Sequence, residues 1–158
     1  MAADMLNTGL YGAELAEVRP GDTVVVMGVG PVGLMAIAGA RLRGAGRIIA
    51  IGSRKAGVEL ARFYGATDLV NYKEGNVERQ IYELTHRQGA DCCICAGGGT
   101  EALGQAVAMV RWGGTVGNVN YFTTYGDLPL NNVRYGFGMG NYGWFFEQWT
   151  GKMGLHYV

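Results

Sequence analysis

Glycine occupies the first, third and sixth positions of residues 28–33, Gly-Val-Gly-Pro-Val-Gly. The run follows the apolar segment 23–27 and opens a helical pattern, so it lies at a strand-to-helix turn. In such a turn Gly28 permits the tight bend, Gly30 lets a ligand approach the backbone, and Gly33 lets the helix pack on the strand. The unpaired backbone N–H groups and the helix dipole favour an anion. The run therefore predicts a site for a pyrophosphate, the linking group of a dinucleotide.

A second group of residues follows the next apolar segment, about twenty positions further on. A domain that binds NAD places Asp or Glu there, where the carboxylate holds the ribose 2′-hydroxyl. This chain has Gly52, Ser53 and Arg54 instead. The glycine leaves room for a 2′-phosphate, the serine can hydrogen-bond it, and the arginine offers a charged planar fork of donors. A cation at a helix N-terminus opposes the helix dipole, which favours a bound phosphate over simple solvation. The pattern predicts NADP rather than NAD.

Two other classes that use a glycine-rich first turn fit less well. Methyltransferases usually place an acid at the position that Ser53 and Arg54 occupy here. Short-chain reductases transfer protons with a tyrosine followed four residues later by lysine, and no tyrosine of this chain has that partner.

Cys92, Cys93 and Cys95 lie in one apolar run. In a strand, Cys92 and Cys93 point to opposite faces, while Cys93 and Cys95 share a face at about 6.6 Å. A zinc ion needs sulfurs about 2.3 Å away in a tetrahedron, which these positions do not provide. We therefore expect three buried structural thiols.

Short β-branched runs alternate with longer helical patterns along the chain. The expected strands are 23–27, 47–51, 68–71, 92–96 and 114–119, and the expected helices are 31–43, 55–64, 76–85 and 100–110. The strands are apolar throughout, which indicates burial on both faces of a sheet. This order predicts an α/β fold, a Rossmann-type doubly wound parallel sheet, that is truncated on its C-terminal side.

The two ends differ from this pattern. Residues 1–19 are expected to form a helix that links the domain to a catalytic domain absent from the chain. Residues 135–158 are rich in glycine and aromatic residues, and 142–146 could form a sixth strand without a covering helix. Such an edge is expected to pair with another segment or with a second subunit in a homo-oligomer. We expect residues 1–158 to be one domain.

Composition excludes several other classes. Thirteen basic and thirteen acidic residues cancel, which gives no indication of nucleic-acid binding or of an anionic membrane surface. No apolar run approaches the roughly 18 residues of a membrane-spanning helix, and the N-terminus lacks the features of a signal peptide. A cytoplasmic protein is expected.

The sequence resembles the zinc-dependent medium-chain alcohol dehydrogenases, and among them the NADP-dependent secondary alcohol dehydrogenases of microbes. Similarity extends from residue 4 to about residue 139, and decays beyond it. It is carried by residues 4–9, 11–15, 28–33, 52–54, 65–68, 70–73, 96–98 and 118–122.

The resemblance implies roles for individual residues. The pyrophosphate would lie on residues 29–32, with the 2′-phosphate and adenosine near residues 52–54 and Tyr72. The remaining cofactor would pass residues 96–98 and reach its nicotinamide end at residues 119–121. The full set of expected NADP-binding residues is Gly28, Val29, Gly30, Pro31, Val32, Gly33, Gly52, Ser53, Arg54, Tyr72, Ala96, Gly97, Gly98, Val119, Asn120 and Tyr121.

Asp4 matches the family's carboxylate ligand to a catalytic zinc, although by sequence alone it would be a helix N-terminal residue. The other zinc ligands and the proton relay of the family lie in a preceding domain, and His86 and His156 are not at matching positions. A catalytic zinc normally has three protein ligands. We therefore name no catalytic residue here and expect the chain alone to be inactive.

The implied function is an oxidoreductase that transfers hydride between NADP(H) and small secondary alcohols, ketones or aldehydes, with zinc in the complete enzyme. Two alternatives stay open. One is a stand-alone module that binds or senses NADPH, and the other is an inactive fragment.

Overall fold

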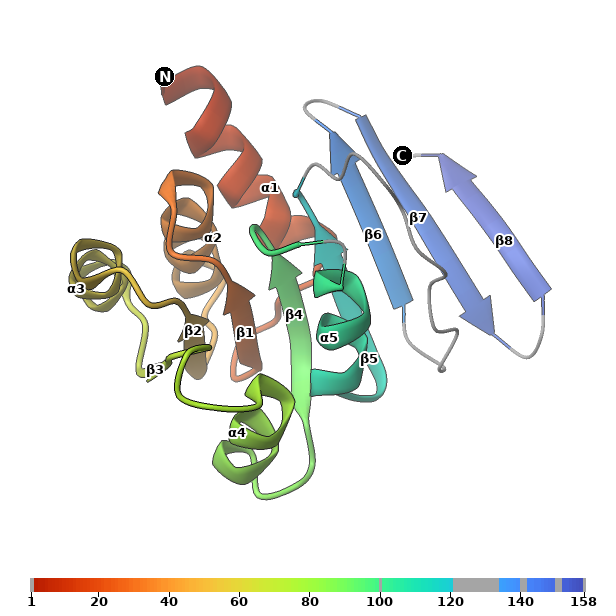
Figure 1. The fold of residues 1–158 in the computed structure, drawn as a ribbon. Coiled ribbons are helices and arrows are strands. Elements are labelled where there is room, and N and C mark those ends of the chain that lie inside the picture. The colour runs from red at the N-terminus through yellow and green to blue at the C-terminus, as the bar shows by residue number, and fades with distance from the viewer. Residues whose placement is uncertain (1, 100, 121–133, 140–141, 150–151, 158) are drawn as a thin grey trace.

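The computed structural model describes residues 2–99, 101–120, 134–139, 142–149 and 152–157, and describes side chains for 4–99 and 101–120. One sheet in the order β3-β2-β1-β4-β5-β6-β7-β8 forms the centre of the molecule (Figure 1). Its strands are β1 (Thr23–Met27), β2 (Arg47–Ile51), β3 (Asp68–Val70), β4 (Ala90–Cys95), β5 (Val110–Asn118), β6 (Arg134–Met139), β7 (Tyr142–Trp149) and β8 (Lys152–Tyr157).

The first six strands are parallel to their neighbours. Their order, 3-2-1-4-5-6, is that of a doubly wound dinucleotide-binding sheet, with the crossover point between β1 and β4. The predicted α/β fold class is confirmed.

The C-terminal strands differ from the prediction. The sixth strand is Arg134–Met139, and the expected strand 142–146 lies within β7, which together with β8 is antiparallel. Only positions 140 and 141 separate β6 from β7, whereas parallel strands need a connection of a dozen or more residues. A direct reversal is therefore the only pairing open to β7. In Figure 1 these strands extend the sheet beyond β5.

The helices cover the two faces of the sheet. They are a π-helical turn (Ala2–Leu6) followed by α1 (Asn7–Leu15), α2 (Pro31–Leu42), α3 (Lys55–Tyr64), α4 (Val77–Leu84) and α5 (Ala102–Met109). Side chains of α1, α2 and α3 pack in one buried cluster, and those of α4 and α5 pack in the other. The expected N-terminal helix ends earlier than residue 19, because Glu17 has a φ of 51°.

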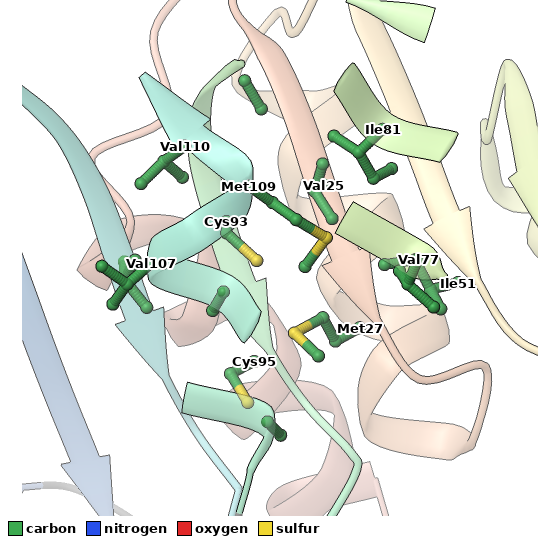
Figure 2. Packing of buried hydrophobic residues seen from close by; sticks show 14 of the residues in the cluster. Val25, Met27, Ile51, Val77, Ile81, Cys93, Cys95, Val107, Met109 and Val110 are labelled. Carbon is green, nitrogen blue, oxygen red and sulfur yellow. The ribbon is translucent and has the colours of Figure 1, made fainter. Parts of the chain in front are cut away.

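The three cysteines are free and buried, as predicted. Cys92 belongs to the cluster under α1 and α2, whereas Cys93 and Cys95 face α5 beside Met27 and Met109 (Figure 2). Burial raises the pKa of the Cys95 thiol to about 12. These thiols are therefore core side chains.

Two ion pairs tie strand ends to neighbouring elements. Arg47 on β2 donates to both carboxylate oxygens of Asp68 on β3, at 2.8 and 2.9 Å, and to the carbonyl of Leu84 at 2.6 Å. Asp91 on β4 accepts from the Thr23 backbone N–H at 2.8 Å and from Arg111 at 2.7 Å. Both lie at the amino ends of the strands, away from the glycine turn. In the described part of the chain, no helix is long and apolar enough to cross a membrane.

Candidate cofactor site

The glycine turn joins β1 to α2 and is held by its neighbours. Gly28 has a φ of 99°, which favours glycine, and its N–H donates to the Ile51 carbonyl at 3.0 Å. A Cβ on Gly28 would lie 3.1 Å from the Ala96 carbonyl oxygen, and one on Gly33 would overlap the carbonyl oxygen of Gly28. The structure thus supports the expected steric roles of Gly28 and Gly33.

Gly30 is different, because the space beside it is open. It is the N-cap of α2 with φ −80° and ψ 179°, a conformation that any residue can adopt. The nearest atom to a Cβ there is Nη2 of Arg54, at 3.9 Å. A glycine at this position therefore leaves the N-terminus of α2 accessible to a ligand.

The structure shows a second reason for glycine at position 52. A Cβ there would overlap the side chain of Val29, and one on Gly57 would lie 2.8 Å from Val29 Cγ2. Val29 is 7% exposed, so its side chain packs between the turn and the start of α3. Only its backbone is available to a pyrophosphate.

A cavity of about 620 Å³ lies at the carboxyl ends of β1, β2 and β4. Open parallel sheets bind ligands at this edge. The volume lies within the range of pockets that bind drug-sized molecules and cofactors. Among the predicted residues, it is lined by Gly28, Val29, Gly30, Gly52, Ser53, Arg54, Tyr72, Ala96, Gly97 and Gly98. The prediction thus identified residues from four separate segments that the fold brings together.

The other predicted residues do not line this cavity. Pro31, Val32 and Gly33 continue into α2, and Tyr121 lies outside the described residues. Val119 packs toward α1, with Cγ2 3.3 Å from the position of a Cβ on Gly12. Asn120 donates through Nδ2 to the Gly98 carbonyl at 3.2 Å. The cavity thus includes the expected pyrophosphate and adenosine parts of the predicted site, and Val119 and Asn120 of the expected nicotinamide end do not line it.

Several lining residues were missed by sequence reasoning. They come from the ends of β1 and β2 and from the starts of α4 and α5: Met27, Ile51, Gly75, Asn76, Val77, Glu78, Gly99, Glu101 and Gln105. No motif marks them. The alternation of strands and helices does place the starts of α4 and α5 at this edge, so the strand order could have identified them as candidates.

Among the residues that the structure describes, Arg54 is the only arginine or lysine that lines this cavity. Within the described residues its guanidinium has no hydrogen bond or ion pair, whereas Arg47 and Arg111 pair with carboxylates. An exposed, unpaired fork of donors beside an open helix N-terminus is suited to a phosphate.

The expected zinc ligand lies elsewhere. Asp4 is exposed in the N-terminal turn, where its carboxylate accepts from the Thr8 hydroxyl at 3.5 Å. The described residues contain no group of three or more His, Cys, Asp or Glu that could hold a metal ion. Since a catalytic zinc needs about three protein ligands, these residues do not form a zinc centre by themselves.

The sheet order, the glycine turn and the cavity define a Rossmann-type dinucleotide-binding domain. The zinc-binding dehydrogenase family model matches residues 31–137, and the chain belongs to this family.

Curated relatives carry more specific names. The NADP-dependent isopropanol dehydrogenases of Thermoanaerobacter brockii and Clostridium beijerinckii are 55% and 54% identical to this chain over 139 residues. Each match covers 88% of this chain and 40% of the relative. The chain thus spans about 40% of the length of these relatives.

Solved structures are similar in fold. The alcohol dehydrogenase of Thermus sp. ATN1 matches with a TM-score of 0.82 and 35% identity, over 89% of this chain and 42% of that one. A zinc-binding dehydrogenase from Sinorhizobium meliloti, described as putative and solved bound to NADP, matches with a TM-score of 0.78 and 26% identity. That match covers 87% of this chain and 42% of that one.

Proposed function

We propose that this chain is the NADP(H)-binding domain of an alcohol dehydrogenase that acts on small secondary alcohols, ketones or aldehydes. NADP supplies the chemistry of such an enzyme by accepting or donating a hydride. The residues of this chain bind and orient the cofactor. Relatives named as NADP-dependent isopropanol dehydrogenases support the substrate class.

The observation that carries the proposal is the unpaired guanidinium of Arg54 over the glycine turn. β2 ends at Ile51, and residues 52–58 that follow it contain no carboxylate that would repel a 2′-phosphate. Ser53 and Tyr72 line the same cavity and add hydroxyl groups. In this arrangement the pyrophosphate lies at the start of α2 and the 2′-phosphate lies on Arg54.

Calorimetric titration of the chain with NADP and with NAD tests this assignment. We expect NADP to bind more tightly than NAD. Arg54→Ala should lower the affinity for NADP by about 10- to 100-fold, the effect of losing one charged hydrogen bond. The affinity for NAD should change little. Arg62→Ala is the matched control, since Arg62 is an exposed arginine of α3 that does not line the cavity. Equal affinity for both dinucleotides, or an unchanged Arg54→Ala variant, would contradict the proposal.

We extend the proposal to the organisation of the protein. Residues 1–158 form one domain, α1 links it to a catalytic domain, and Asp4 contributes one ligand to the zinc of the complete enzyme. The C-terminal strands pair with a second subunit. The compartment that we propose for the protein is the cytoplasm.

A further inference from the structure

The cavity has two unlike walls. One wall consists of the glycine turn with Ser53 and Arg54, whose backbone N–H groups and guanidinium attract anions. The other wall consists of the starts of α4 and α5, which contribute Glu78, Glu101 and Gln105. A ligand that carries only phosphates would be repelled there. The second wall therefore indicates that the far part of the ligand offers a hydrogen-bond donor.

Glu101 is placed by the loop that leaves β4. Its Oε2 lies 2.7 Å from the position of a Cβ on Gly99, so the carboxylate folds back over that glycine. Glu101 is the N-cap of α5, yet its side chain makes no capping hydrogen bond. In the described part of the chain, the carboxylate has no hydrogen-bond or ion-pair partner. Helix capping therefore does not account for its position.

Glu78 has a simpler explanation. It lies in the first turn of α4, where a negative charge is stabilised by the helix dipole. Asn76 already caps this helix by accepting from the Arg79 N–H at 2.7 Å. The dipole of α5 stabilises the charge of Glu101 in the same way. Glu101 differs from Glu78 because its carboxylate folds back over Gly99, in the loop that follows β4.

The segment that carries Glu101 is fixed to the phosphate turn. A Cβ on Gly97 would lie 3.3 Å from Cα of Gly28, so the two backbones touch. The Gly98 carbonyl accepts from Asn120 Nδ2, which ties the end of β4 to the end of β5. A ligand held on the glycine turn therefore lies at a defined position relative to α5.

We propose that the Glu101 carboxylate recognises the 6-amino group of the adenine ring. This inference rests on the proposed NADP site. Met27, Ile51 and Val77 belong to the core, and the 5–7% of each that is exposed gives the cavity an apolar lining against which the base can lie. The 6-amino group is a donor, and an ionised carboxylate can only accept. A purine without this amino group offers no donor at that position and leaves the carboxylate without a partner.

The test compares NADP with its analogue that carries unsubstituted purine, which is adenine without its 6-amino group. Calorimetry on the whole chain measures both affinities for wild type, Glu101→Gln, Glu78→Gln and Glu83→Gln. We expect wild type to prefer NADP by about tenfold, the lower end of the range for one charged hydrogen bond, because Glu101 is exposed. In Glu101→Gln the amide can also donate, so the preference should fall to about twofold or less. Glu83→Gln changes an α4 carboxylate that does not line the cavity and should keep the preference.

Each other outcome overturns the inference in a distinct way. Binding of neither dinucleotide by folded wild-type protein would overturn the proposed function together with the role of Glu101. Tight NADP binding without a preference between the bases would leave the cofactor site standing and refute the role of Glu101. A preference lost in Glu78→Gln but kept in Glu101→Gln would likewise refute it.

Discussion

The guanidinium of Arg54 lies over Gly30, with Nη2 3.9 Å from the position that a Cβ on Gly30 would occupy. Among the described residues, no other atom outside its chain neighbours and its own helix comes within 4 Å of that position. The start of α2 and the Arg54 side chain therefore face one common space. A dinucleotide that carries a pyrophosphate and a 2′-phosphate can use both at once.

This relationship predicts the effect of Gly30→Ala. The backbone at Gly30 suits any residue and the new methyl group meets no close neighbour, so the free energy of unfolding should change by less than about 0.5 kcal/mol. The methyl group would occupy the space through which a pyrophosphate reaches the backbone. We expect the affinities for NADP and NAD both to fall by about tenfold or more. Calorimetry and thermal unfolding measure the two effects, and unchanged affinity would argue against pyrophosphate binding here.

Gly33→Ala, in the same turn, should instead lower the stability of the protein. Its Cβ would overlap the carbonyl oxygen of Gly28, so the turn must shift and we expect a loss of about 1–3 kcal/mol of stability. Gly104→Ala is the matched control. Gly104 lies inside α5 with open space around it, and alanine should stabilise that helix by about 0.5–1 kcal/mol. Denaturant unfolding of the three proteins tests this order, and equal stability of the two variants would contradict it.

Much of the parallel sheet could be predicted from the sequence. After their first residues, β1 and β2 are apolar and mainly β-branched, and each is followed by a glycine, so their ends at Met27 and Ile51 are clear. β5 is less clear. It begins at Val110 rather than Gly114, because Ala90 pairs with Val110 before the register shifts to Cys92 opposite Thr115. Such an irregularity depends on the partner strand and leaves no local pattern.

The residues that line the cavity likewise divide into those that local sequence predicts and those that depend on the pairing of strands. Its phosphate-binding residues belong to local motifs, because a turn and a strand end have fixed spacing. Glu101 and Gln105 belong to no motif, and they reach the cavity only because β4 lies beside β1. The antiparallel direction of β7 follows from the short connection to β6, but the sequence pattern does not predict β6 (Arg134–Met139) as a strand.

The buried cysteines predict low thiol reactivity. Burial raises the pKa values of Cys92, Cys93 and Cys95, and thiolate is the reactive form. At pH 8 the folded protein should therefore react with a thiol-specific disulfide reagent far more slowly than free cysteine. After unfolding in guanidinium, all three thiols should react. Labelling of any of them in folded protein at the rate of free cysteine would contradict their burial.

The ion pair between Arg47 and Asp68 predicts how stability depends on pH. Hydrogen bonds from Arg47 hold the pKa of the Asp68 carboxyl below its usual range, against the opposing effect of burial. Because the folded pKa is the lower one, the stabilisation is complete above the unfolded pKa, about 4, and is lost as pH falls through the folded pKa. Asp68→Asn should cost about 1 kcal/mol at pH 7 and should reduce the loss of stability below about pH 4.

Glu83→Gln provides the comparison, since it removes an ion pair of a different kind. The Arg79–Glu83 pair is 81% and 63% exposed, whereas Arg47 and Asp68 are 33% and 24% exposed. An exposed pair four residues apart on a helix contributes about 0.3–0.5 kcal/mol. Denaturant unfolding at pH 7 and pH 3 should therefore separate the two variants, with the larger loss at pH 7 in Asp68→Asn. Equal losses would mean that the Arg47 contacts to β3 and Leu84 add nothing beyond a solvated charge pair.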